Sequence, residues 1–306
     1  MERTYINEVQ KEIGSTVKVQ GFIENLRNSK YMAFIVLKDI TGKLQITVEK
    51  EDHPELVDTI DKLTPDSVIT VTGKVMENDY VKMGGIEMIP EAIEIESIAN
   101  ALPIVRKEIA ATKKKKAVER SSIDQRIDYR WIDLRTDENQ LMFKAQSCFV
   151  NAMRKFLLDR NFIEIHTPKL IAAASESGSE VFKVDYFDRN AYLAQSPQFY
   201  KQMAMAAGFE RIFETGPVFR AEKSYTNKHS TEFSGFDLEF SYITSYKDVM
   251  KMEEELLTAG LQAVKDNYGD QIKEMFGQEV IVPTTPFPVV KLADLYKGLE
   301  EEFGYT

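Results

Sequence analysis

Apolar and polar residues alternate along several stretches between residues 15 and 98, and this period of two predicts β-strands. In the first stretch, Val17, Val19 and Ile23 would lie on one face of a strand. Strands are expected over residues 15–23, 32–38, 43–48, 67–75 and 85–98. So many short strands in so short a segment indicate a small β-domain.

Two further features of this region point to one kind of β-domain. Asp39 to Gly42 join two apolar runs and favour a hairpin, with Gly42 at the turn. Residues 54–62 carry a helical pattern that interrupts the strands. About five strands with one inserted helix are typical of a closed barrel of the OB type. We therefore expect residues 1–98 to form an OB-fold β-barrel.

The pattern changes beyond a lysine-rich stretch at 99–125, which is either a solvated linker or a hinge near a polyanion. Asp137 is expected to cap a helix that ends near Asn161, because apolar positions recur there at helical spacing. Strands and helices then follow each other over 126–306. The pattern over 126–306 is α/β, and with the barrel and the basic hinge ahead of it and an antiparallel strand pair within it, the predicted fold class of the chain is α+β.

Composition limits the partners and the compartment. The chain of 306 residues has a net charge of −10, which argues against binding nucleic acid through bulk charge but allows local basic patches. One cysteine excludes a disulfide framework, and no apolar run approaches the roughly 18 residues of a membrane span. The three histidines are scattered, which disfavours a histidine-built metal site. We expect a cytoplasmic protein without a membrane or DNA partner.

A short helix is predicted over 197–207, with Ser196 as its N-cap and Gly208 as its stop. Gln198 and Lys201 lie three residues apart and would share a face of the first turn. Free backbone N–H groups and the helix dipole favour carboxylates and phosphates at such a place. Many exposed helix starts look like this, so spacing alone leaves the alternative of a solvated surface open.

The next segment predicts two strands joined by a polar loop, and both strands carry charges on one face. Arg220 and Glu222 are two residues apart in the first strand and would point the same way. Asp237 and Glu239 occupy one face of the second strand, opposite an apolar face. That apolar face consists of Phe236, Leu238 and Phe240. The arrangement is either a half-exposed sheet with salt bridges or a site in which arginine holds a phosphate and carboxylates hold an amine.

These motifs, taken in order, resemble the class II aminoacyl-tRNA synthetases. FRAE, KSYTNKHST and EFSGFDLEF over 219–240 resemble the second signature of that family. FIEIHTPKL over 162–170, a predicted strand ended by Pro168, resembles the first, whose proline belongs to the dimer interface. QRIDYRWIDLR over 125–135 is similar to the entry into the catalytic domain. An OB-type module ahead of it matches subclass IIb, the aspartyl, asparaginyl and lysyl enzymes.

Within subclass IIb the resemblance is to the aspartyl enzymes, which carry Gln-Ser-Pro-Gln-x-x-Lys as residues 195–201 do. Lys201 would offer its charge to the side-chain carboxylate of aspartate, and Gln198 would add a hydrogen bond. The stretch ASESGSEVF resembles the mobile loop of these enzymes, with Glu176 as partner of the substrate ammonium. The sequence GPVFRAE is more similar to the second signature of the archaeal and eukaryotic enzymes than to that of the usual bacterial enzymes.

The resemblance also implies roles in the use of ATP. Arg220 would hold the α-phosphate, Glu222 would accept from the adenine amino group, and Phe233 would stack on adenine. His229 would approach the outer phosphates, and Asp237 would help hold the substrate ammonium. The implied reaction forms aspartyl-adenylate from aspartate and ATP and transfers aspartate to tRNA(Asp), with tRNA(Asn) as a further candidate. Such chemistry needs positioning and charge neutralisation more than a nucleophile.

In the barrel, the resemblance assigns Phe34 to stacking on an anticodon base and Gln45 to reading one. Arg27 and Glu87 are further candidates for the same role. Unstacked bases read by aromatic rings and polar groups are typical of single-stranded RNA recognition. The alternative for Phe34 is a place in the barrel core.

The chain departs from the family because a third signature, glycine-rich and ending in arginine, is absent. Residues 221–306 contain no arginine. We expect a C-terminally truncated synthetase whose Mg²⁺ ligands lie beyond residue 306, with no metal site in this chain and no adenylate formation by the chain alone. The parent would be a homodimer. Two alternatives are an asparaginyl-type paralogue and a non-catalytic tRNA-binding paralogue.

Overall fold

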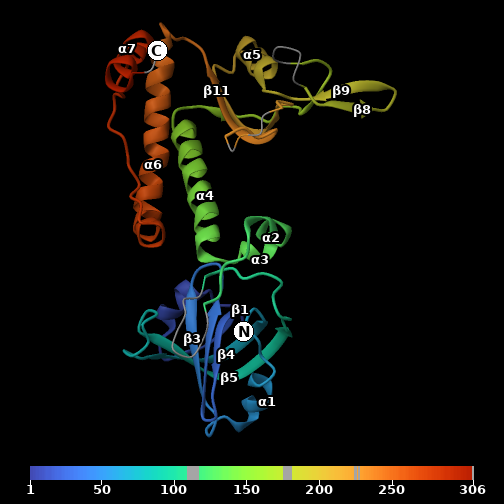
Figure 1. Ribbon diagram of the computed structural model, residues 1–306, viewed down its shortest axis with the longest axis vertical. Coiled ribbons are helices and arrows are strands. Elements are labelled where there is room, and N and C mark those ends of the chain that lie inside the picture. Colours follow the sequence, from blue (N-terminus) through green and yellow to red (C-terminus); the bar gives the residue numbers. More distant parts are fainter. Residues whose placement is uncertain (109–116, 175–180, 224–225, 227, 305–306) are drawn as a thin grey trace. The chain divides into compact units, whose positions relative to one another are not determined.

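The structure is a computed structural model that describes residues 1–108, 117–174, 181–223, 226 and 228–304. The chain divides into two compact units, Met1–Ile132 and Asp133–Thr306, and each is described by itself (Figure 1). Within the described ranges, no helix combines the length and the apolar character needed to cross a membrane.

Unit 1 is a closed barrel in which the strands follow one another in the order β1-β2-β3-β5-β4. The strands are β1 (Thr16–Asn28), β2 (Met32–Lys38), β3 (Lys43–Glu49), β4 (Val68–Glu77) and β5 (Ile86–Ser97). Helical turns lie at η1 (Ile6–Glu12), η2 (Pro54–Leu56), α1 (Val57–Ile60) and α2 (Ile123–Asp128), and α3 (Arg130–Asp133) spans the boundary between the two units. This confirms the predicted OB-type barrel, with its inserted helix between β3 and β4.

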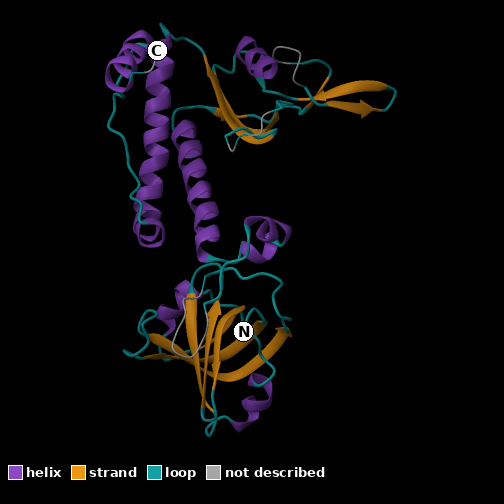
Figure 2. Ribbon diagram, viewed as in Figure 1, coloured by secondary structure: helices purple, strands orange, loops and turns teal. Residues whose placement is uncertain are grey.

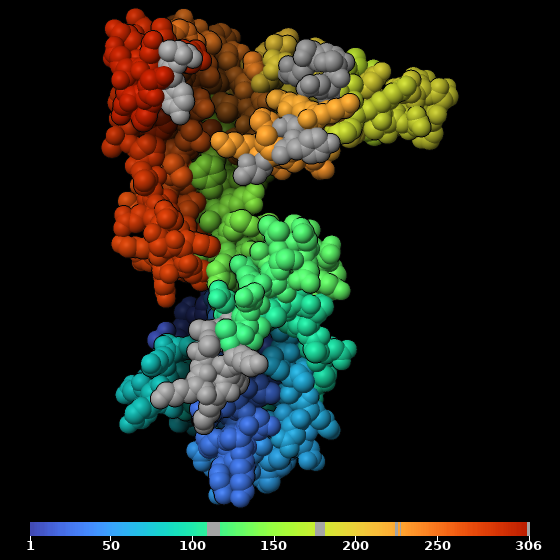
Figure 3. Space-filling view, in the orientation of Figure 1, coloured from blue at the N-terminus to red at the C-terminus, as the bar shows by residue number. Residues whose placement is uncertain are grey.

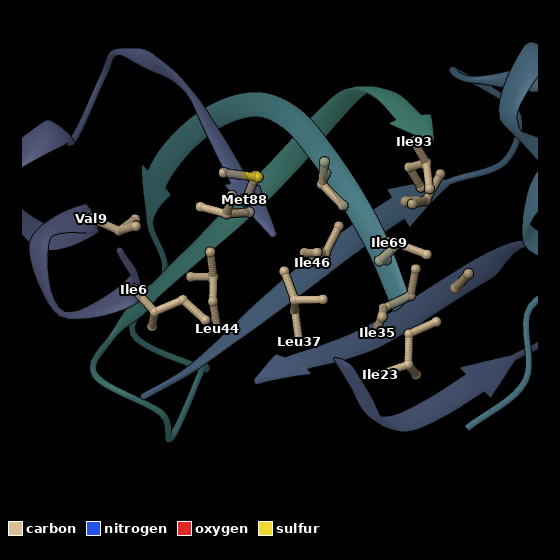
Figure 4. Packing of buried hydrophobic residues seen from close by; sticks show 14 of the residues in the cluster. Ile6, Val9, Ile23, Ile35, Leu37, Leu44, Ile46, Ile69, Met88 and Ile93 are labelled. Carbon is tan, nitrogen blue, oxygen red and sulfur yellow. The ribbon is translucent and has the colours of Figure 1, made fainter. Parts of the chain in front are cut away.

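The alternation of residues fills the barrel from all five strands, because every second side chain points inward. Figure 4 shows this packing, in which isoleucine, leucine, valine and methionine side chains meet along the axis. Fully buried examples are Ile23, Ile35, Leu37, Leu44, Ile46, Ile69 and Met88. The hairpin at Asp39 forms as predicted, and its carboxylate accepts hydrogen bonds from the Thr41 and Gly42 N–H groups at 2.7 and 3.0 Å.

The segment after β5 stays attached to unit 1. The Thr64 hydroxyl donates to the Ala99 carbonyl at 2.7 Å, and Arg106 pairs with the buried Asp66 carboxylate at 2.7 Å. Most of the basic run of the predicted hinge, 109–116, lies outside the described residues.

Unit 2 contains two long helices and two three-stranded sheets, ordered β11-β10-β6 and β7-β9-β8 (Figure 2). Its helices are α4 (Asp137–Leu158), α5 (Gln198–Ala206), α6 (Tyr246–Phe276) and α7 (Leu292–Phe303). Its strands are β6 (Ile163–Glu164), β7 (Leu170–Ile171), β8 (Lys183–Tyr186), β9 (Arg189–Leu193), β10 (Arg211–Phe219) and β11 (Glu232–Phe240). In the space-filling view the β8–β9 hairpin projects from the rest of this unit (Figure 3).

Two elements of unit 2, the helix α4 and the strand β6, have boundaries that differ from the predicted ones. Thr136, rather than Asp137, caps α4, because its extended backbone places its hydroxyl against the Asn139 N–H at 3.4 Å. Asp137 is the first helical residue, where a negative charge also favours the helix dipole. The strand predicted to run from Phe162 until Pro168 ends it is confined to β6, which pairs in parallel with β10.

The core of unit 2 lies between α4, α6 and one face of the β10–β11 sheet. Its fully or nearly buried members are Met153, Leu157, Phe162, Phe213 and Leu256. Phe236, Leu238 and Phe240 of β11 pack against it, as the alternation along that strand predicts. The opposite face of β11 is thereby left for polar side chains.

Close packing of α4 against α6 depends on Gly260. A Cβ atom at this position would lie 2.6 Å from the Phe149 ring and 3.1 Å from Met153, whereas one at Gly269 of the same helix would meet only Lys265 at 3.6 Å. We expect Gly260→Leu to be about 2 kcal/mol less stable than Gly269→Leu, because only the first overpacks the contact while helix propensity changes equally. Urea denaturation followed by circular dichroism measures this difference, and equal stabilities would contradict it.

Candidate functional sites

The helix that carries Gln198 and Lys201 is formed, but it begins one residue later than predicted. α5 starts at Gln198 with Pro197 at the N-cap, and the Ser196 hydroxyl accepts a hydrogen bond from the Gln198 N–H at 3.3 Å. Gly208 adopts a positive φ of 85° just beyond the helix end, a conformation that favours glycine. The local sequence therefore fixes both ends of a short helix that lies against β10 and β11.

Lys201 projects from α5 onto the polar face of β11. Its ammonium Nζ lies 2.6 Å from Asp237 Oδ1 and 3.2 Å from Glu239 Oε2. The lysine side chain is 14% exposed, while each carboxylate side chain is 30% exposed. Burial by itself lowers the pKa of Lys201, but the two carboxylates outweigh burial and the net shift is upward. The lysine is therefore held as a cation.

The contact between α5 and β11 brings together residues that were predicted on a helix and on a strand. Asp237 and Glu239 occupy the polar face of β11, as predicted, and Lys201 reaches them from the helix. Gln198 is half-buried and precedes Lys201 by one turn of α5. An ammonium donates up to three hydrogen bonds, and the two carboxylates take two of them. The ammonium therefore has the capacity to donate to one further acceptor.

Arg220, Glu222 and Phe233 lie where the two strands open into their connecting loop. Arg220 follows β10 instead of lying within it, which corrects the prediction, and its N–H donates to the Thr231 carbonyl at 3.0 Å. Its guanidinium lies 5.6 Å from the centre of the Phe233 ring and 4.0 Å from the Glu222 carboxylate. Both Arg220 and Phe233 keep partial exposure, so a planar ligand and an anion can reach them.

Among the described residues, the other predicted site residues of unit 2 make no hydrogen bond, ion pair or ring contact with Arg220, Glu222 or Phe233. His229 is exposed in the loop between β10 and β11, with its Nδ1 atom 2.7 Å from the Thr226 hydroxyl. Pro168 is exposed after β6. Glu176 lies outside the described residues.

Glu214 of β10 is a buried carboxylate that sequence analysis missed. Its side chain accepts hydrogen bonds from the Thr167 N–H at 2.8 Å and the Thr167 hydroxyl at 2.7 Å, and it pairs with Lys169 at 3.0 Å. Glu214 is 4% exposed. Burial raises the pKa of Glu214, but the donors from Thr167 and Lys169 outweigh it and the net shift is downward. Glu214 therefore holds Thr167 and Lys169, the two neighbours of Pro168, against the sheet. In the sequence, the only sign of this role is an acidic residue within an otherwise apolar strand.

Three of the four candidate RNA-binding residues of the barrel lie on neighbouring strands of one outer face. Arg27 of β1, Phe34 of β2 and Thr47 of β3 are cross-strand neighbours, and Gln45 lies two residues before Thr47. Phe34 is half-buried, whereas the flanking residues that point into the barrel are fully buried. Phe34 is therefore a residue of the outer face and not of the core.

Glu87 of β5, the fourth candidate, is the centre of a hydrogen-bond cluster on the same face. It pairs in register with Gln45, and its carboxylate accepts from the Thr47 hydroxyl, from Asn78 at 2.7 Å and from Gln45 Nε2 at 3.4 Å. Gln45 Nε2 also donates to Thr47 at 3.1 Å. Because Glu87 is 9% exposed and engaged by three donors, its geometry suits orienting Gln45 more than direct contact with a ligand. Sequence analysis did not identify Thr47 or Asn78.

No group of three or more histidine, cysteine, aspartate or glutamate side chains in the described part of the chain has the geometry to hold a metal ion. The polar cluster around Lys201 combines one cation with two carboxylates, and the lysine ammonium occupies the place between them.

Comparison with known proteins gives two family matches that follow the two units. Residues 17–96 match the OB-fold nucleic acid binding domain, and residues 122–301 match the class II tRNA synthetases of the D, K and N group. The second match alone covers more than half of the chain.

Curated relatives agree with these matches. The chain is 42% identical over 298 residues to an aspartate–tRNA(Asp/Asn) ligase of Methanopyrus kandleri, covering 95% of this chain and 67% of the relative. It is 42% identical over 259 residues to an aspartate–tRNA(Asp) ligase of Picrophilus torridus, covering 84% and 58% respectively. The chain thus spans about two thirds or less of the length of these relatives.

Solved structures with the same fold include both amino-acid specificities. An asparaginyl-tRNA synthetase of Pyrococcus horikoshii in complex with asparaginyl-adenylate matches with a TM-score of 0.88 and 28% identity, over 99% of this chain and 68% of that one. An aspartyl-tRNA synthetase of Entamoeba histolytica matches with a TM-score of 0.80 and 29% identity, over 100% and 64%. The barrel, the polar sheet face and the family matches together establish that the chain belongs to the class II aminoacyl-tRNA synthetases and is a homologue of archaeal aspartate–tRNA ligases.

Proposed function

We propose that these residues form the first two thirds of an aspartate–tRNA ligase, which activates aspartate with ATP and transfers it to tRNA. The observation that carries this proposal is Lys201, a cation held on the polar face of the β10–β11 sheet with the capacity for one further hydrogen bond. A cation at this place favours a substrate with a side-chain carboxylate over one with a neutral amide, because it attracts a negative charge and offers it a hydrogen bond. This supports the aspartyl over the asparaginyl alternative, whereas the fold is common to both.

The proposed reaction begins with the α-carboxylate of aspartate and ATP. A carboxylate oxygen attacks the α-phosphorus, the bond to the pyrophosphate oxygen breaks, and aspartyl-adenylate forms. A hydroxyl of the terminal ribose of tRNA then attacks the activated carbonyl, and AMP leaves. Neither step needs a protein nucleophile, so the site contributes orientation and charge.

Each side chain at the open end of the strands has a part in that orientation. Arg220 offers two parallel donors to the α-phosphate, and Phe233 offers its ring to adenine. Glu222 would accept from the adenine amino group, and His229 would approach the outer phosphates. Glu176 and Asp237 would hold the substrate ammonium, and Gln198 would add a hydrogen bond to the aspartate side chain.

The barrel face would bind the anticodon of tRNA(Asp), and tRNA(Asn) is a further candidate. Phe34 offers a ring for stacking, Arg27 a positive charge, and Gln45 a polar group whose orientation Glu87 sets. The longer parent would form a homodimer in which Pro168 takes part. Mg²⁺ is expected with ATP, but no group of described residues fits it, so we assign no ligand and no step to the metal in this chain.

Pyrophosphate exchange tests this proposal. The 306 residues alone are expected to show background exchange, because relatives continue for about another third of their length. The same residues fused to the last third of the Methanopyrus kandleri relative are expected to exchange with aspartate and not with asparagine. Exchange that responds to asparagine would support the asparaginyl alternative. Aspartate-dependent exchange by the 306 residues alone would contradict the expected inactivity.

A further inference from the structure

The loop between β4 and β5 is a closed, hydrogen-bonded turn beside the Gln45–Glu87 cluster. The Asn78 N–H donates to the Gly85 carbonyl at 2.9 Å, and the Val81 N–H donates to the Asn78 carbonyl at 2.9 Å. The Gly85 N–H donates to the Val81 carbonyl at 3.0 Å, and Val81 is 5% exposed. The buried valine and these three bonds give the loop one defined conformation.

Tyr80 is the residue that this loop presents to solvent. Its side chain is 95% exposed, although its backbone N–H is fixed by the Asn78 side-chain oxygen at 3.0 Å. The amide nitrogen of the same Asn78 side chain donates to Glu87 at 2.7 Å. One asparagine thus connects the backbone of Tyr80 to the carboxylate that orients Gln45.

We propose that Tyr80 is a base-stacking residue that extends the RNA-binding face beyond Phe34. The proposal rests on the anticodon-binding part of the proposed function. In OB folds, oligonucleotides bind the face of the second and third strands together with two loops, one between the first and second strands and one between the fourth and fifth. A tyrosine held on a defined loop loses little conformational freedom on binding, and its ring can stack on any base.

Local charge favours a base over a phosphate as the group that meets Tyr80. Glu77 and Asp79 flank the loop start, both exposed, and Lys82 is the one cation in the loop. A phosphate here would meet net negative charge, whereas a neutral base ring would not. The ring of Tyr80 is therefore the feature of this loop that suits an unstacked nucleotide.

Binding of the fluorescein-labelled anticodon stem-loop of the Methanopyrus kandleri tRNA(Asp) to the full 306-residue chain, measured by anisotropy, tests the inference. We expect Tyr80→Ala to weaken binding at least about fivefold, as the loss of one stacked base does, and Tyr80→Phe to stay within about twofold. The slope of affinity against salt should not change, because no phosphate contact is lost. Tyr296→Ala, on the exposed face of α7, is the matched control and should bind like the unmodified chain.

The outcomes separate this inference from the function on which it rests. If the unmodified chain binds the stem-loop no better than a fully paired RNA duplex, the anticodon-binding proposal fails. If Phe34→Ala weakens binding while Tyr80→Ala does not, anticodon binding stands and the role of Tyr80 is refuted. If Tyr80→Phe loses as much as Tyr80→Ala, the hydroxyl and not the ring is responsible, which also refutes stacking.

Discussion

Replacing Lys201 with methionine is expected to lower the free energy of unfolding of unit 2 by about 2 kcal/mol, because Asp237 and Glu239 would then face each other without a cation. Each carboxylate is partly exposed, so the loss should fall below that of a fully buried pair. The raised pKa of Lys201 gives a stabilisation that is complete below its ordinary value of 10.5. It is lost only as the pH rises through the still higher folded value, so the effect should be constant around neutral pH.

Urea denaturation followed by far-ultraviolet circular dichroism measures this loss. A chain that carries Lys201→Met together with Asp237→Asn and Glu239→Gln should recover most of the stability, because the repulsion is removed with the cation. Lys297→Met is the matched control, since Lys297 and Glu301 form an exposed pair on α7 at 3.7 Å. An effect of Lys201→Met no larger than the control, or no recovery in the triple variant, would show that the three charges do not act as one group.

Replacing Glu214 with glutamine is expected to destabilise unit 2 by about 3 kcal/mol at neutral pH. The amide would set its NH₂ group against donors from Thr167 or Lys169, and the partly buried ammonium of Lys169 would lose its negative partner. Because the pKa of Glu214 is lowered in the folded protein, its charge stabilises the fold at pH values above 4.5, the ordinary pKa of a glutamate side chain. As the pH falls below 4.5 and through the folded value, that contribution disappears.

The difference between the Glu214→Gln variant and the unmodified chain should therefore shrink as the solution becomes acidic. Urea midpoints at a series of pH values measure this trend. Glu301→Gln, which changes an exposed carboxylate, should show a small effect at every pH. A difference that stays constant below pH 4.5 would mean that shape, and not charge, makes Glu214 important.

Sequence patterns predict those elements whose stability comes from local spacing. The barrel strands follow from period-two alternation, since Ile35 and Leu37 must point inward where Phe34 points outward. The same alternation along β11 predicts that Asp237 and Glu239 share a face that Phe236 does not occupy. Family motifs then supply roles that no local pattern contains.

Features that depend on contacts between distant segments escape sequence reasoning. Glu214 meets Thr167 only because β6 pairs in parallel with β10, and Asn78 meets Glu87 only because a turn brings β4 and β5 together. The observed helix starts differ from the predicted ones by one residue, because the side chain that caps a helix depends on the local backbone geometry. Thr136, which caps α4 in place of the predicted Asp137, is an example.

The closed barrel also determines when unit 1 can fold during synthesis. β1 pairs with both β2 and β4, and β5 pairs with both β3 and β4, so the ring cannot close before β5 has left the ribosome. Pairing of such distant strands is slow compared with forming local hairpins. Because domains earlier in a chain complete folding while later residues are still being made, the proposed RNA-binding face would form before Lys201 meets its two carboxylates.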